Sequence, residues 1–144
     1  MPTNLPLDDH IVRYVPYQRT RRDEDDNVVG VLAEAFRLKA GEQGLSVTWV
    51  EYFSGNWDEQ FIAAIGAIRH TQHAGKRSAF AWGQVGRVYQ TCMEKSYRVR
   101  IIHAPEDENP GHSEIRRLPR DDELLLEMLA TDAFIGFRLN AQIP

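Results

Sequence analysis

The sequence predicts an α+β fold, in which two or three helices pack on one face of a mostly antiparallel sheet. Short segments of alternating apolar and polar residues, typical of half-buried strands, are mixed with two segments of helical periodicity. Strands and helices do not alternate strictly, which argues against a doubly wound parallel sheet. The chain has 144 residues, of which 42% are hydrophobic and 26% charged, enough for one core. We therefore expect residues 1–144 to form a single domain.

The first third of the chain predicts two strands and a short helix. Residues 11–15 are β-prone and end at a proline, so we expect a strand at a sheet edge. The charged residues of 19–27 predict an exposed loop. Residues 31–37 fit a short helix, although 28–32 also fit a strand. Residues 45–53 alternate most clearly and predict a strand.

The middle of the chain predicts a helix followed by paired strands. Asn56 and Glu59 are placed to form a capping box at the start of a helix over 57–70. Residues 78–93 are rich in aromatic and β-branched types and contain two glycines, which indicates a bent strand or two successive strands. A turn then leads into a strand over 97–103, giving an antiparallel pair.

The last third predicts a loop, a second helix and a final strand. Residues 104–111 are acidic and contain two prolines, which favours a loop. Asp121 is placed to cap a helix over 121–131, whose leucines recur at helical spacing. Residues 133–139 fit a last strand.

Composition restricts the classes of function. Cys92 is the only cysteine, so no intrachain disulfide forms, and a reducing, cytoplasmic location is favoured. Residues 1–6 lack the features of a signal peptide, and no stretch approaches the ~20 apolar residues that cross a bilayer, so we expect no membrane association. A net charge of -4 argues against nucleic-acid binding. Two arginine clusters are interpreted as mixed-charge surface: Arg19, Arg21 and Arg22, and Arg116, Arg117 and Arg120.

A loop with imidazoles and carboxylates at its ends suggests a metal site. His103 and His112 are candidate ligands, with Glu114 nearby, because zinc and other divalent ions bind these groups. Their spacing matches no metal-binding motif, and acidic proline-containing loops are usually solvated connections. We therefore expect no metal and no other cofactor.

Candidate catalytic residues are His112, Glu114, Ser46 and Arg13. The adjacent His112, Ser113 and Glu114 cannot form a local triad, because neighbouring residues of an extended segment point to opposite faces. Cys92 lies among apolar residues and is expected to be a buried, inert thiol.

Two resemblances involve these residues. The order Arg13, Ser46, Glu51 resembles that of ADP-ribosyltransferase-like folds, which bind NAD, but alternation places Ser46 and Glu51 on opposite faces of a strand. Residues 35–47 (A-F-R-L-K, then E-x-G-L-S-V) and 111–115 (G-H-S-E-I) resemble a group of small uncharacterised bacterial proteins. That resemblance implies a bacterial origin and no particular activity, and it directs attention to Ser46 and His112.

Two hypotheses of function follow. The first is a small bacterial accessory or protein-interaction module, of a defence or toxin-antitoxin type, that binds a protein partner or a second copy through a sheet edge or helix face. The alternative is a small enzyme or metal-binding protein that acts on a nucleotide-like or phosphorylated substrate through His103, His112 and Glu114, together with Ser46 or Arg13. The sequence leaves open whether the protein is an enzyme.

Overall fold

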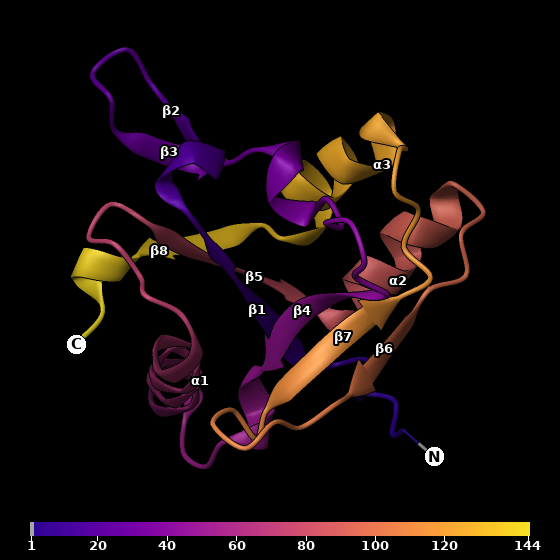
Figure 1. Cartoon of the computed structure of the whole chain (residues 1–144), viewed down its shortest axis with the longest axis horizontal. Helices are drawn as coiled ribbons and strands as arrows, with labels where there is room; N and C mark the ends of the chain where they lie inside the picture. Colours follow the sequence, from indigo (N-terminus) through magenta and orange to yellow (C-terminus); the bar gives the residue numbers. More distant parts are fainter. Residues whose placement is uncertain (1) are drawn as a thin grey trace.

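A six-stranded sheet, with its strands in the order β6-β7-β4-β1-β5-β8, forms the centre of the computed structural model, which describes residues 2–144 (Figure 1). Every neighbouring pair of strands in it is antiparallel. Its strands are β1 (His10–Val15), β4 (Gly44–Trp49), β5 (Ala79–Gln84), β6 (Arg100–His103), β7 (His112–Arg116) and β8 (Gly136–Leu139). A separate hairpin consists of β2 (Thr20–Arg22) and β3 (Val28–Val31). These elements confirm the α+β class and the mostly antiparallel sheet.

Helices cover both faces of the sheet. They are α1 (Trp57–Thr71), α2 (Val85–Glu94) and α3 (Glu123–Met128), and α3 continues as a π-helical turn over Leu129–Ala133. As expected, α2 and α3 pack together on one face, but α1 lies on the other. The reason is the apolar character of both faces: Ile11 of β1 packs towards α2 and α3, whereas the adjacent Val12 packs towards α1. Both side chains are buried, so each face needs its own helical cover.

The start of α1 confirms the predicted capping box. The Asn56 side chain accepts a hydrogen bond of 3.0 Å from the Glu59 amide, and the Glu59 carboxylate accepts one of 3.0 Å from the Asn56 amide. Both bonds satisfy N–H groups that an uncapped helix leaves without partners. Short 3-10 helices occupy Tyr17–Arg19, Ala33–Phe36, Val50–Tyr52 and Asn140–Gln142.

The strand prediction for residues 78–93 is wrong in its second half. Strand β5 ends at Gln84, and the next ten residues form α2. Its buried residues Val85, Val88 and Cys92 recur at helical spacing, a pattern that the β-branched and aromatic composition obscured. Gly83 marks a close backbone approach and not a bulge, because a Cβ built there would lie 2.4 Å from the Ala133 carbonyl oxygen.

Other segments also differ from their prediction, and Thr20–Arg22 forms β2 inside the predicted loop over 19–27. Strand β1 is an interior strand between β4 and β5, because the proline that follows it lies beyond the hydrogen-bonded residues. Residues Val28–Val31 form β3, in agreement with the strand alternative for 28–32, and Ala33–Phe36 form a 3-10 helix where a short α-helix over 31–37 was predicted. Strand β7, which the sequence left unassigned, pairs with β6, so the predicted pairing of 78–93 with 97–103 does not occur.

The sheet is split between its two central strands. Strand β1 pairs with β4 at only two positions, Ile11 with Trp49 and Val12 with Thr48, and with β5 at six. Beyond Val12 the strands β1 and β4 diverge, as Figure 1 shows. The Arg13 side chain bridges this gap by donating hydrogen bonds to the carbonyl oxygens of Ala35 (2.6 Å) and Ser46 (2.7 Å).

No helix in the described part of the chain, residues 2–144, is long and apolar enough to cross a lipid bilayer.

Candidate functional site

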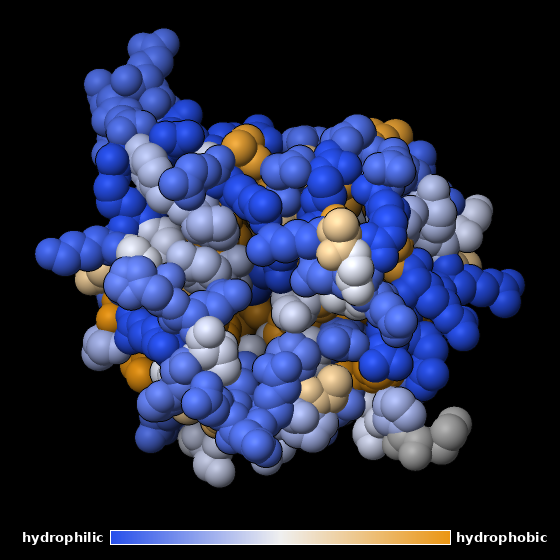
Figure 2. All heavy atoms as spheres, in the orientation of Figure 1, coloured by the Kyte–Doolittle hydropathy of each residue, from blue (hydrophilic) through white to orange (hydrophobic). Residues whose placement is uncertain are grey.

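A cleft of about 520 Å³ opens where β1 and β4 diverge. Its walls come from β1, β4, the C-terminal end of α1 and the loop between β6 and β7. The polar and charged lining residues are Arg13, Tyr14, Gln18, Arg19, Lys39, Ser46, Thr48, Thr71, Gln72, Glu106, Asn109 and His112. Hydrophilic residues surround the hollow near the middle of the molecule in Figure 2. Cavities of this size hold small organic ligands.

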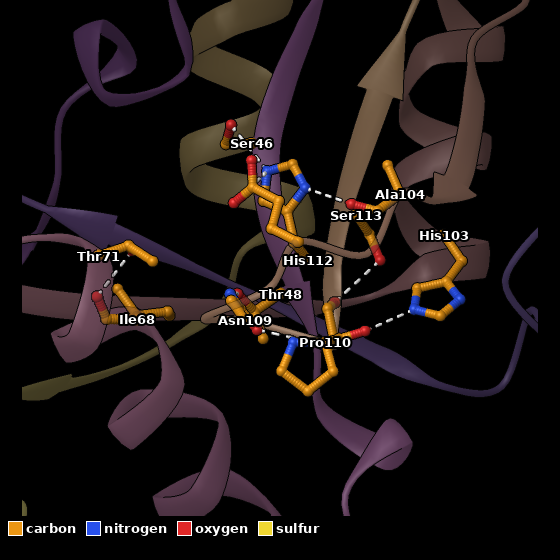
Figure 3. Close-up of polar contacts among 12 residues, drawn as sticks. Ser46, Thr48, Ile68, Thr71, His103, Ala104, Asn109, Pro110, His112 and Ser113 are labelled. Atoms are coloured by element: carbon orange, nitrogen blue, oxygen red, sulfur yellow. Dashed lines mark hydrogen bonds and ion pairs between the residues drawn. The ribbon is translucent and has the colours of Figure 1, made fainter.

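Ser46 and His112 meet inside this cleft. Strands β4 and β7 pair Thr48 with His112 and Ser46 with Glu114, so Ser46 and His112 are diagonal neighbours on one face of the sheet. The Ser46 Oγ lies 3.2 Å from the His112 Nε2 (Figure 3). Ser46 is exposed to solvent, whereas the His112 ring is almost entirely buried. The Ser46 hydroxyl is therefore accessible, while the His112 ring is held in place.

A backbone carbonyl determines the tautomer of His112. The His112 Nδ1 lies 2.8 Å from the carbonyl oxygen of Ala104, which can only accept a hydrogen bond. Nδ1 therefore carries the proton, and in the neutral ring Nε2 is left with a lone pair that faces the Ser46 hydroxyl. Ser46 donates to His112, as a nucleophile donates to its general base.

Asn109 fixes the loop that carries the Ala104 carbonyl. This side chain is buried, donates 2.9 Å to the Thr48 Oγ1 and accepts 3.2 Å from the Gly111 amide. The Asn109 backbone carbonyl oxygen accepts a hydrogen bond of 3.1 Å from the His112 amide. The same loop places Glu106 Oε1 at 4.0 Å from His112 Nε2, so a carboxylate stands beside the imidazole. The loop is thus tied both to β4 and to the histidine.

The structure separates the two candidate metal ligands, His103 and His112. His103 pairs with Ser113 across β6 and β7, so its ring points to the face opposite that of His112. There it lies 5.2 Å from the Trp49 ring, and its Nε2 donates 2.7 Å to the Pro110 carbonyl oxygen. No group of three His, Cys, Asp or Glu side chains within residues 2–144 is arranged to hold a metal ion. His103 therefore packs and orients the loop.

Glu114 lies opposite Ser46 in the sheet but is engaged elsewhere. Its carboxylate accepts a 3.0 Å hydrogen bond from Arg116, which lies on the same face of β7. Within residues 2–144 Glu114 forms no hydrogen bond or ion pair with His112, so Ala104 and not Glu114 orients the imidazole. Of the four candidate catalytic residues, Arg13, Ser46 and His112 line the cleft.

Three other sequence candidates lie outside the cleft. The Cys92 thiol is buried, and desolvation raises its pKa to about 12, so it is protonated at neutral pH. The Ser113 hydroxyl is buried and donates to the Gly111 carbonyl oxygen. Glu51 accepts hydrogen bonds from the His10 amide (2.7 Å) and contacts the His10 ring (2.5 Å), so it does not join Arg13 and Ser46 in one site.

Sequence reasoning missed several lining residues. Arg19 was assigned to mixed-charge surface, and Lys39 and Asn109 were not singled out. Arg19 is the last residue of a one-turn 3-10 helix that begins after Pro16, and Lys39 lies shortly after a second 3-10 helix. Neither position belongs to a periodic pattern that would reveal the cleft. The acidic loop gave no indication that Asn109 is its one buried polar side chain.

Comparison of the chain with models of protein families, with curated proteins and with solved structures found no match.

Proposed function

We propose that this protein is a small bacterial enzyme of the cytoplasm in which Ser46 is the nucleophile and His112 the general base. The observation that carries the proposal is the ordered series of Ser46 Oγ, His112 and the Ala104 carbonyl oxygen, at 3.2 and 2.8 Å. Nucleophilic serines are activated by a base that a third group orients. The single, buried cysteine supports a reducing location.

The chemistry is hydrolysis or group transfer through a covalent Ser46 ester. The Ser46 Oγ attacks the electrophilic atom of the substrate while His112 Nε2 takes the hydroxyl proton. The bond to the leaving group then breaks, and the imidazolium returns that proton to the leaving oxygen. Water or a second alcohol attacks the ester with His112 again acting as base, which restores Ser46. During these steps Ala104 and Glu106 face the positively charged ring and stabilise it.

Covalent labelling tests this proposal. A fluorophosphonate reacts with an activated serine by forming an O–P bond and releasing fluoride. We expect stoichiometric labelling of the full chain, mapped to Ser46 by peptide mass spectrometry, and none in Ser46→Ala. His112→Gln removes the base, so labelling should slow about 100-fold, the lower end of general-base contributions.

Ser54→Ala is the matched control, because Ser54 is also exposed but lies on the turn before α1. It should label like the unmodified protein, and thermal melts should show that all variants are folded. Labelling that Ser46→Ala leaves unchanged, or a rate that is the same in His112→Gln, contradicts the proposal.

A second candidate function, a protein-interaction module, is supported by the unequal edges of the sheet. The β6 edge is covered by the N-terminal segment, where the Leu5 amide donates to Ile101 and Thr3 accepts from His103. Strand β8 lies at the other edge, next to the exposed Ile135 and Val29. An uncovered edge beside apolar side chains supports strand pairing with another chain.

A further inference from the structure

Arg13 carries a charge that no carboxylate neutralises by contact. Two of its five N–H donors bind neutral carbonyl oxygens, and within residues 2–144 its guanidinium forms no ion pair. Burial lowers the pKa of Arg13 to about 10, although Glu42 nearby opposes this shift, so the group is still a cation at neutral pH. Burying a charge is costly unless a counter-ion compensates it.

The free end of this guanidinium opens to the cleft. The Arg13 Nη2 makes no hydrogen bond in the described chain, where no fully buried side-chain nitrogen or oxygen lacks a partner. Nη2 is therefore reached by solvent, and the cleft is the cavity that Arg13 lines. Because Nη1 binds the Ser46 carbonyl at 2.7 Å, these donors are held beside the residue that carries the nucleophile.

Two more cations line the same cavity. Arg19 and Lys39 come from the segments after β1 and before β4, and in residues 2–144 their side chains form no hydrogen bond or ion pair. Three cations and one carboxylate, Glu106, give the cleft a formal charge of +2. The whole chain has a net charge of -4, so this concentration of positive charge is local. A positive cleft with low-dielectric walls attracts anions.

We propose, on the basis of the proposed function, that the substrate is a small phosphate monoester whose phosphate binds to Arg13, Arg19 and Lys39. A phosphate dianion balances the charge of the cleft, and the guanidinium fork matches phosphate oxygens. Cations on the transferring group also stabilise phosphoryl transfer. The net charge of -4 of the whole chain disfavours binding of a nucleic-acid chain.

The transfer step balances without a further reactant. The Ser46 Oγ forms a bond to phosphorus, the bond from phosphorus to the alcohol oxygen breaks, and His112 moves the serine proton to that oxygen. Water then attacks phosphorus, the Ser46 O–P bond breaks, and inorganic phosphate leaves. The products are the free alcohol and phosphate.

Calorimetric titration with inorganic phosphate at low ionic strength tests the binding site. We expect one site per chain, and about tenfold weaker binding in Arg19→Gln and in Lys39→Gln, since each loses one charge-assisted bond. Arg98→Gln is the matched control, because Arg98 is exposed and outside the cleft, and its affinity should be unchanged. Arg13→Gln should bind weakest, and its thermal melt shows whether it folds.

Ser46→Ala separates the two proposals. It should still bind phosphate, and phosphate should protect Ser46 of the unmodified protein from the fluorophosphonate. Labelling of Ser46 together with no phosphate binding overturns the substrate class alone, whereas phosphate binding without labelling overturns the nucleophile alone. Equal phosphate affinity in Arg19→Gln, Lys39→Gln and Arg98→Gln, or preferential binding of a single-stranded 20-residue oligonucleotide, also overturns the phosphate monoester site.

Discussion

At the scale of single residues, backbone carbonyls prepare the cleft more than charged partners do. The Ala104 carbonyl selects the tautomer of His112, and the carbonyls of Ala35 and Ser46 hold Arg13 without neutralising it. A neutral acceptor fixes the geometry of a side chain without neutralising its charge. The Arg13 charge therefore stays available to a ligand, and the lone pair of His112 Nε2 to the Ser46 hydroxyl. Asn109 is the side chain on which this arrangement depends, because it joins the loop to Thr48.

Replacement of Asn109 by alanine should therefore lower both stability and reactivity. Loss of its amide leaves the buried Thr48 hydroxyl and the Gly111 amide without partners, which costs about 1–3 kcal/mol of unfolding free energy. Urea denaturation measures this, and Ser46 labelling should slow because the loop no longer orients His112. Asp107→Ala, an exposed change in the same loop, should stay within about 0.5 kcal/mol of the unmodified protein. Equal values for both variants would refute this role for Asn109.

At the scale of elements, register decides which side chains meet. The antiparallel pairing of β4 with β7 places Ser46 diagonal to His112, and a shift by one residue would send either side chain to the opposite face.

The start of a helix depends on the residue that caps it. Helix α3 begins after Asp122, one residue later than predicted, because the Asp122 carboxylate accepts from the Leu125 amide at 3.0 Å.

The Asp122 cap should give stability a specific pH dependence. The hydrogen bond from the Leu125 amide, followed by that from the Tyr97 hydroxyl, lowers the pKa of Asp122 in the folded protein. A lowered folded pKa stabilises the fold at neutral pH, and this contribution is lost as the pH falls from about 4 through the folded pKa.

Asp122→Asn keeps a capping oxygen but removes the charge, so it should be less stable than the unmodified protein at pH 7. Urea unfolding between pH 7 and 2 should show the difference shrinking below about pH 4. Asp121→Asn, at the exposed neighbouring position, is the control and should show no such convergence. A difference that is independent of pH would exclude the charge as its cause.

At the scale of the whole molecule, cover of the sheet is uneven. Helices α2 and α3 close one face, α1 closes only the side of the other face near β1 and β5, and the cleft occupies the part that α1 leaves open. The two edges differ as well, since the chain's own N-terminal segment covers β6 but no described segment covers β8. Catalysis and association would therefore use different parts of the surface.

We expect a second copy to pair along β8. Light scattering after size exclusion should show a dimer at high protein concentration and a monomer after dilution. Ile135→Asp places a charge beside this edge, where Ile135 is 74% exposed, and should prevent dimer formation. Leu124→Asp, a similar change at a 59% exposed residue of α3, should leave the dimer intact. A monomer at every concentration would refute self-association and leave the cleft proposal unaffected.

The sequence by itself determined what depends on neighbours along the chain. The α1 capping box, the alternation in β4 and the inert Cys92 follow from local spacing and burial preference. In α3 the leucine spacing predicted the helix but not its buried face, since Leu124 is 59% exposed and Leu126 is buried. Helix α2 was missed because its composition favours strands, while its helical form depends on packing against α3 and the sheet.

Only the tertiary structure decided the candidate site. Ser46 and His112 are 66 residues apart in sequence, and Arg13 reaches Ser46 across 33. Their approach depends on strand order, register and the divergence of β1 from β4, which are set by packing of both sheet faces. Local pattern identifies which face a side chain occupies, but it carries no information about the strand that lies beside it.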